Sequence, residues 1–184
     1  MFSFLVGRVA DIKQNYIHFF VNDGFGFKIF IINKNNYKVN ELYKIFVIDL
    51  FREEEGINLY GFLKNEESLL FSKLITVNGI GPKTAMNILK NSDLNALIYY
   101  IKNRMIESIN NISGACNKGQ SIVYELNNKM KEFDIGIFEY EPVYSALKNL
   151  GFNNQQINNA VCRISSGLTC DEAVKQCLRI IQNG

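Results

Sequence analysis

Five short runs of β-forming residues within the first 64 positions constrain the fold of this chain more than any other feature. The runs are rich in Val, Ile, Phe and Tyr, and turn residues such as Asn22-Asp23-Gly24 and Glu55-Gly56 separate them. So many short strands in so small a segment would leave unpaired edges unless the sheet closed on itself. We therefore predict a small closed barrel over residues 1–64. The predicted strands are Phe4–Ile12, Tyr16–Val21, Phe25–Ile32, Lys44–Leu50 and Ile57–Phe62.

Residues 65–133 change to a helical pattern. Apolar residues recur three and four positions apart, as at Leu70 and Leu74 and at Ala85, Ile88 and Leu89, and Gly and Asn cluster between the runs. Helices this short need tertiary packing to persist. The segment therefore predicts one compact helical domain.

Residues 141–184 predict a third domain, a bundle of three helices. Pro142 suits the first turn of a helix, and Gly151 suits its C-cap. Two more helical patterns follow, at about 154–164 and 169–181. A short, unusually apolar linker, residues 134–140, would join this domain to the one before it.

The cysteines and the termini exclude several classes of protein. Cys116, Cys162, Cys170 and Cys177 form no Cys-x-x-Cys pair, and the single histidine, His18, is distant in sequence, so we expect buried free thiols and no metal or cofactor. The start of the chain does not have the pattern of a signal peptide, and no apolar run is long enough to span a membrane. We expect a cytoplasmic protein.

The segment Val77-Asn78-Gly79-Ile80-Gly81-Pro82-Lys83-Thr84 has the strongest functional pattern. Its two glycines would let a ligand approach the backbone, Ile80 would anchor the turn, and Pro82 would begin a helix capped by Gly81. The free N–H groups at such a helix start favour an anion. An ordinary interhelical turn is the alternative.

Lys83 favours the anion hypothesis. A lysine in the first turn opposes the helix dipole at a cost of roughly 0.3–1 kcal/mol, and a bound anion would reverse that sign. DNA phosphate is the obvious ligand. We therefore predict that Asn78, Gly79, Ile80, Gly81, Lys83 and Thr84 bind DNA.

A second, weaker candidate lies at residues 112–119. It repeats the order helix, glycine turn, lysine and helix, with Gly114, Lys118 and Gly119 as the candidate DNA-binding residues. Cys116 stands where the second glycine would be. A plain helix connection explains this segment about as well.

The acidic run Glu53, Glu54 and Glu55 falls between two predicted strands. A solvated turn is one explanation and part of a metal-nuclease site is another. A third is electrostatic, because carboxylates near DNA repel phosphates and could keep strands apart. With one histidine and no nucleophile or phosphate-loop motif, the chain is expected to bind rather than catalyse.

Four stretches of the chain resemble the RuvA family of Holliday-junction-binding subunits of bacterial branch migration complexes. They are Gly7-Arg8-Val9, Gly24-Phe25-Gly26-Phe27, Leu59-Tyr60-Gly61-Phe62 and Leu70 through Leu89. The resemblance follows the whole chain in order. It implies an OB-like barrel over residues 1–64, a tandem helix-hairpin-helix domain over 65–133, the linker, and a UBA-like three-helix domain over 141–184.

The resemblance also implies a function. It predicts a homotetramer, or two tetramers forming an octamer on DNA, that holds a four-way junction open without reading sequence. Local phosphate contacts repeated around the tetramer would compensate for a net charge of only +2 per chain. The acidic run would be the family's acidic pin, the third domain would bind the hexameric ATPase RuvB, and RuvC would be a further partner. Leu147, Leu150 and Phe152 could form the motor-binding surface, although core packing explains them equally well.

Three departures from the family pattern and two competing functions accompany this prediction. The acidic turn is one residue longer than the family pattern, so either pair of its three acids could form the pin, the second hairpin is broken at Cys116, and the linker is short. We therefore expect the first hairpin to provide more of the DNA grip than in a typical relative. The competing functions are a helix-hairpin-helix nuclease or glycosylase, and a module that binds only proteins.

Overall fold

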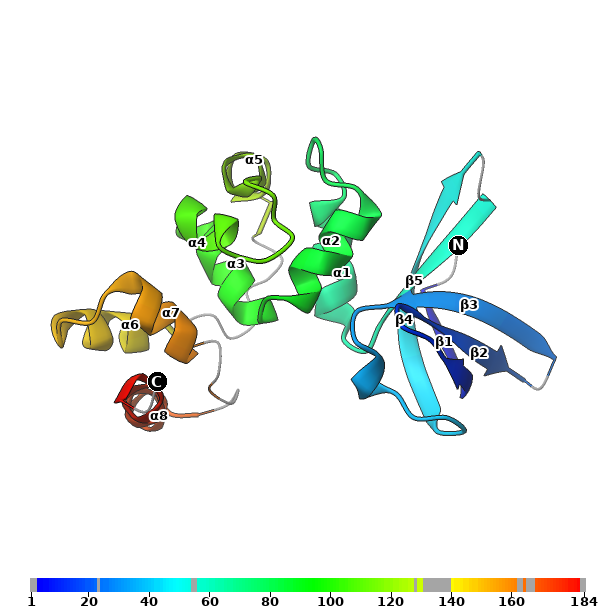
Figure 1. The fold of residues 1–184 in the computed structure, drawn as a ribbon, viewed down its shortest axis with the longest axis horizontal. Coiled ribbons are helices and arrows are strands. Elements are labelled where there is room, and N and C mark those ends of the chain that lie inside the picture. The colour runs from blue at the N-terminus through cyan, green and yellow to red at the C-terminus, as the bar shows by residue number, and fades with distance from the viewer. Residues whose placement is uncertain are drawn as a thin grey trace. The chain divides into compact units, whose positions relative to one another are not determined.

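The fold was analysed in a computed structural model that describes residues 3–22, 24–53, 56–127, 129–130, 140–161, 164 and 168–182. The chain divides into two compact units, Met1–Asn91 and Ser92–Gly184. In the described residues, the first contains a β-barrel, a short 3-10 helix (Lys34–Asn36) and two α-helices, and the second contains the remaining helices (Figure 1).

The barrel is a closed sheet of five strands in the order β1-β2-β3-β5-β4. All neighbouring strands are antiparallel except β3 and β5, which are parallel. Closure leaves no strand with an unpaired edge, as the sequence predicted. The strands are β1 (Phe4–Ile12), β2 (Tyr16–Val21), β3 (Phe25–Ile31), β4 (Leu42–Arg52) and β5 (Gly56–Phe62).

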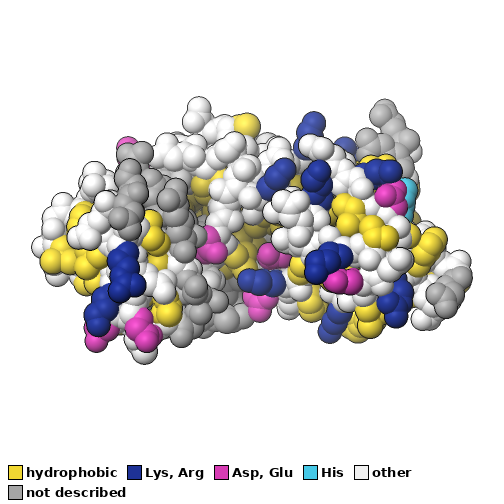
Figure 2. All heavy atoms as spheres, turned by 60° about the horizontal axis from the view of Figure 1, so that its bottom comes forward, with side chains coloured by type: hydrophobic (Ala, Val, Ile, Leu, Met, Phe, Trp, Pro, Cys, Tyr) yellow, Lys and Arg dark blue, Asp and Glu magenta, His cyan; other side chains and the backbone are white. Residues whose placement is uncertain are grey.

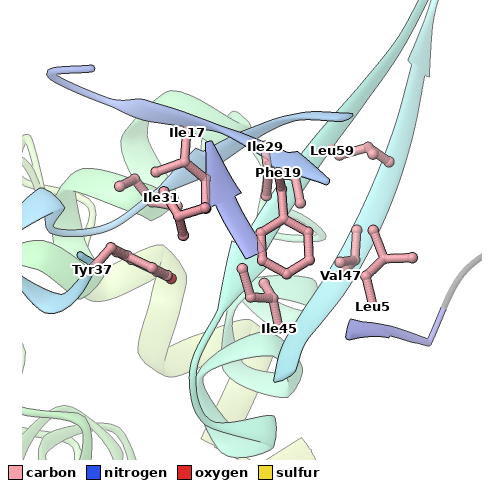
Figure 3. Close-up of a cluster of buried hydrophobic side chains, with 10 residues drawn as sticks. Leu5, Ile17, Phe19, Ile29, Ile31, Tyr37, Ile45, Val47 and Leu59 are labelled. Carbon is pink, nitrogen blue, oxygen red and sulfur yellow. The ribbon is translucent and has the colours of Figure 1, made fainter. Parts of the chain in front are cut away.

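Alternate residues of the strands fill the barrel. Leu5, Ile17, Phe19, Ile29 and Ile45 point into this core, which excludes water almost completely (Figure 3). Gly61 marks a point of close packing, since a Cβ atom there would lie 2.5 Å from the Cγ2 atom of Ile29. The glycine of the Leu59-Tyr60-Gly61-Phe62 motif is thus explained by packing within the barrel.

Two helices complete the first unit. Helix α1 (Asn65–Leu74) buries Leu70, Phe71 and Leu74, and its Phe71 ring stacks on Tyr60 of β5 with centroids 5.1 Å apart. Helix α2 (Pro82–Lys90) packs on α1 through Ala85, Ile88 and Leu89. Residues 75–81 connect the two helices and contain the predicted phosphate-binding turn.

The second unit begins with three short helices that contact one another. Helix α3 (Leu94–Lys102) starts at Asp93, whose side chain accepts hydrogen bonds from the N–H groups of Asn95 and Ala96. Helices α4 (Ile106–Asn110) and α5 (Gly119–Leu126) flank the second predicted hairpin.

Three further helices form a compact bundle with its own core. They are α6 (Tyr140–Asn149), α7 (Asn154–Val161) and α8 (Cys170–Gln182). Val143, Leu147, Ile157 and Cys177 are fully buried between them. Helix α6 begins at Tyr140, so Pro142 lies in its first turn as predicted, and Gly151 has the left-handed φ of +88° expected just after a helix. The other residues of the predicted linker, 134–139, lie outside the described residues.

Of the three cysteines that the structure describes, only Cys177 is buried as expected. Burial raises the pKa of this thiol to about 11, whereas Cys116 and Cys170 are exposed free thiols. Cys162 lies outside the described residues. Within the described part of the chain, no helix is both long and apolar enough to cross a membrane.

Candidate nucleic-acid interface

The first hairpin is a tight turn anchored by two buried side chains. Val77 and Ile80 are 2% and 4% exposed, and the N–H of Ile80 donates to the carbonyl of Val77 at 3.0 Å. Gly79 lies between them at φ +77°, in the left-handed region that glycine enters without strain. Ile80 thus anchors the loop, while Asn78, Gly79 and Gly81 lie exposed on it.

Helix α2 begins with open donors beside a positive charge. Its first helical hydrogen bond runs from the N–H of Ala85 to the carbonyl of Gly81 at 3.0 Å, so the N–H groups of Lys83 and Thr84 have no helical carbonyl to bond. Gly81 provides no side-chain cap, and Pro82 has no N–H. The exposed Lys83 is therefore in the first turn, next to donors that suit an anion.

The second hairpin differs in backbone conformation. Gly114 has a φ of +95° and Ala115 is fully buried, which matches the positions of Gly79 and Ile80 in the first hairpin. Cys116 and Asn117 then adopt φ values of +49° and +57°, whereas Gly81 of the first hairpin is extended with a φ of −86°. As a result, α5 begins two residues later in its hairpin than α2 does.

Because α5 begins later in its hairpin, Lys118 and Gly119 occupy different positions in the helix start from Lys83 and Thr84. Lys118 is the half-buried N-cap residue of α5, and its N–H donates to the carbonyl of Ala115 at 2.9 Å. Gly119 is buried, and its N–H donates to Oδ1 of Asn110 at 2.8 Å. The first helical bond runs from Ile122 to Lys118, so the donors left at the start of α5 belong to Gln120 and Ser121.

The acidic run lies in the connection between β4 and β5. Arg52 pairs with Gly56, whose φ of +72° fits a tight hairpin turn, and Glu53 is exposed. Glu54 and Glu55 lie outside the described residues. Phe51 and Ile57 form the preceding cross-strand pair, and both side chains are exposed.

The three candidate motor-binding residues occupy different environments. Leu147 is fully buried in the core of the α6–α8 bundle, so core packing accounts for it. Phe152 is half-buried against the same core. Leu150, by contrast, is 59% exposed and remains available to a partner.

Sequence reasoning missed an apolar surface on the outside of the barrel, named here the outer barrel patch. Phe4 and Val6 of β1, Phe20 of β2 and Leu42 of β4 are between 45% and 62% exposed. Apolar side chains reach the surface over the barrel among Lys and Arg side chains (Figure 2). The sequence pattern that could have predicted this patch is the start of β1, where the residues that face inward and those that face outward are both apolar.

Comparisons with known proteins agree with this architecture. The family model described as "RuvA, C-terminal domain" matches residues 140–182, which contain the α6–α8 bundle. The Holliday junction branch migration complex subunit RuvA of Oenococcus oeni is 32% identical over 98% of this chain and 99% of its own length. The subunits of the same name from Malacoplasma penetrans and Lactobacillus gasseri are 34% and 37% identical, over 88% and 72% of this chain and 83% and 69% of their own lengths. This chain belongs to the RuvA family.

Proposed function

We propose that this protein is the DNA-binding subunit of a branch migration complex, which holds four-way junctions open and recruits a RuvB motor without catalysing a reaction itself. The observation that carries the proposal is the start of α2, where uncapped N–H donors, an exposed glycine turn and Lys83 lie together. The match to junction-complex subunits along almost the whole chain supports the same function.

The protein would bind DNA through contacts to the phosphates of the DNA backbone. Asn78, Gly79 and Gly81 would let a phosphate approach the backbone, while Lys83 and Thr84 would donate to it. None of these contacts requires a particular base, so binding would be independent of sequence.

The second hairpin would contribute a weaker contact. Gly114 shapes its turn, and Gln120 and Ser121 offer the open donors, with Lys118 nearby. The N–H of Gly119 already donates to Oδ1 of Asn110, so Gly119 would not contact the phosphate.

Assembly into a homotetramer, with two tetramers able to enclose one junction, would multiply these contacts. The outer barrel patch supports assembly, because exposed apolar side chains grouped on one sheet are typical of protein interfaces. The first unit would thus combine the DNA-binding turn between α1 and α2 with a barrel surface for a second copy.

The acidic run and the third domain have proposed roles at the centre and edge of the complex. Glu53, Glu54 and Glu55 would repel the phosphates of duplex DNA at the crossover. The α6–α8 bundle would bind RuvB, with exposed Leu150 as a candidate contact, and RuvC would join as resolvase. We propose that these events take place in the cytoplasm.

A binding and cleavage assay with labelled DNA tests the proposal. The protein is mixed with a four-way junction and with a linear duplex of the same sequences, in Mg²⁺, and the products are separated on native and denaturing gels. We expect a retarded band with the junction at concentrations that leave the duplex free, with every strand intact. Strand cleavage would favour the nuclease alternative, and equal binding of both DNAs would overturn junction recognition.

A further inference from the structure

A pocket of about 540 Å³ lies in the first unit, between one end of the barrel and helix α2. Gln14 and Asn15 from the β1–β2 turn, Phe30 from β3 and Tyr60 from β5 line the barrel side. Its size falls within the range of about 300–1,000 Å³ that is usual for small-molecule and cofactor sites. Neither the phosphate-binding turn nor the acidic run explains this pocket.

Helix α2 presents one face to the pocket. Lys83, Met86, Asn87 and Lys90 all line it, and their spacing of three, four and seven residues puts them on one side of a helix. Lys83 and Lys90 therefore place two positive charges along the same wall. None of the described residues that line the pocket is Asp or Glu, which would neutralise them.

The barrel wall combines aromatic rings and amides. The Phe30 ring stacks on Tyr60 with centroids 5.4 Å apart, and Lys28 lies 5.1 Å from the centroid of Phe30. The N–H of Ile31 donates to the carbonyl of Asn15 at 3.0 Å, which fastens the β1–β2 turn to β3. This wall is therefore held in place before any ligand arrives.

We propose that this pocket binds one nucleotide of a single DNA strand, with its base against the half-buried Phe30 and Met86 and its phosphate at Lys83 and Lys90. Single-strand sites combine aromatic surface with cations in this way. The amides of Gln14, Asn15 and Asn87 both donate and accept hydrogen bonds, as base edges do. The inference rests on the proposed function, since Lys83 is also the proposed phosphate contact of the first hairpin.

The methionines give a direct test, because Met86 is the one that lines the pocket among those in the described part of the chain. The full-length protein, labelled with ¹³C at its methionine methyl groups, is titrated with a short single-stranded oligothymidylate. Separate titrations use thymidine monophosphate, inorganic phosphate and a polyglutamate peptide. We expect the oligothymidylate to shift the Met86 signal and to leave Met105 and Met130, in the second unit, unchanged.

Two exposed pocket residues and one matched control complete the test. Asn87→Leu and Lys90→Gln should each weaken oligothymidylate binding by about tenfold, the loss expected for one hydrogen bond or one charged contact. Lys148→Gln removes the same charge from exposed α6 and should have no effect on the Met86 shift. Circular dichroism of each variant separates a lost contact from a lost fold.

Several outcomes would overturn the inference. An unmoved Met86 signal at saturating oligothymidylate would do so, as would an equal shift with phosphate alone or with the acidic peptide. A shift with the monophosphate but none with the strand would make a free nucleotide the ligand instead. Junction binding by the wild type is measured in parallel. If the Met86 signal does not shift but the junction is still bound, the nucleotide site in this pocket is contradicted and the proposed function still stands.

Discussion

Gly79 and Gly81 differ in backbone conformation, although only one residue separates them. Gly79 has a φ of +77°, which side chains with a Cβ atom adopt only with strain. Gly81 is extended at φ −86° and ψ 173°, and a Cβ atom there would meet nothing within 4 Å. Folding therefore explains the first glycine but not the second, which is consistent with a ligand approaching the backbone at Gly81.

Substitution at the two glycines should separate stability from DNA binding. Gly81→Ala should leave the free energy of unfolding within about 0.5 kcal/mol of wild type, as for other unstrained surface changes, yet lower junction affinity. Gly79→Val should lower both, with a stability loss of about 1–2 kcal/mol from the left-handed backbone. Urea unfolding and gel shifts measure the two effects, and full junction affinity in Gly81→Ala would contradict close phosphate approach.

Lys83 should contribute through its charge alone. Lys83→Ala should weaken junction binding at every DNA sequence and reduce the slope of log K against log salt by about 0.9 for each subunit engaged. We also expect it to cost less affinity than Gly79→Val, which would block the backbone. Fluorescence anisotropy across a salt series measures the slope, with Lys148→Ala as the control. An unchanged slope would argue against a phosphate at Lys83.

At the scale of elements, the two hairpins place a lysine at different points of a helix start. Lys118→Ala should therefore lower junction affinity less than Lys83→Ala, because Lys118 is the half-buried N-cap and precedes the open donors. Asn110→Ala should instead cost about 1 kcal/mol of stability, as loss of a helix cap does, since it leaves the buried N–H of Gly119 without its 2.8 Å acceptor. Equal losses of affinity at both lysines would show that the two hairpins grip DNA alike.

The β4–β5 turn should act by repulsion. Replacing Glu53, Glu54 and Glu55 with Gln keeps the shape of the side chains and removes three negative charges. Affinity for plain linear duplex should rise, most clearly at low salt where screening is weak. A duplex titration at two salt concentrations measures this, and an unchanged affinity would leave the run as a solvated turn.

Local sequence signals were enough to predict most elements but not their full lengths. The predicted bounds of β1 and β2 match the structure, because Asn15 lies in the turn between them and Asn22 follows β2. Strand β4 was predicted as Lys44–Leu50 but runs from Leu42 to Arg52. Its extra residues pair with Arg8 and Gly56, and such cross-strand pairing is not visible in the local pattern.

For the candidate site too, the local sequence pattern does not show contacts between residues that are distant in sequence. The first hairpin could be predicted because its glycines, proline and lysine are adjacent in sequence. The bond from Gly119 to Asn110 spans nine residues, and the nucleotide pocket combines segments from residue 14 to residue 90, so both depend on packing. At the scale of the whole molecule, tertiary contacts therefore define the parts of the site that sequence reasoning missed.

The outer barrel patch leads to a prediction about the whole assembly. Leu42 is 62% exposed, and it pairs across strands with Arg8, while the 45% exposed Val6 pairs with Lys44. Leu42→Glu should leave the isolated barrel folded, because the side chain is at its surface. In an assembly, however, it would bury a carboxylate at an apolar contact, which costs free energy even with Arg8 across the strands.

We therefore expect the wild type to form a tetramer and Leu42→Glu to dissociate toward the monomer with its circular dichroism unchanged. Light scattering coupled to gel filtration, with and without a four-way junction, measures the mass. Tyr124→Glu is the matched control, because Tyr124 is an 87% exposed aromatic residue on α5, outside the patch. Junction affinity should fall with the mass in Leu42→Glu, since a monomer of net charge +2 has few phosphate contacts of its own. A monomeric wild type that binds junctions fully would contradict both the patch and the need for repeated contacts.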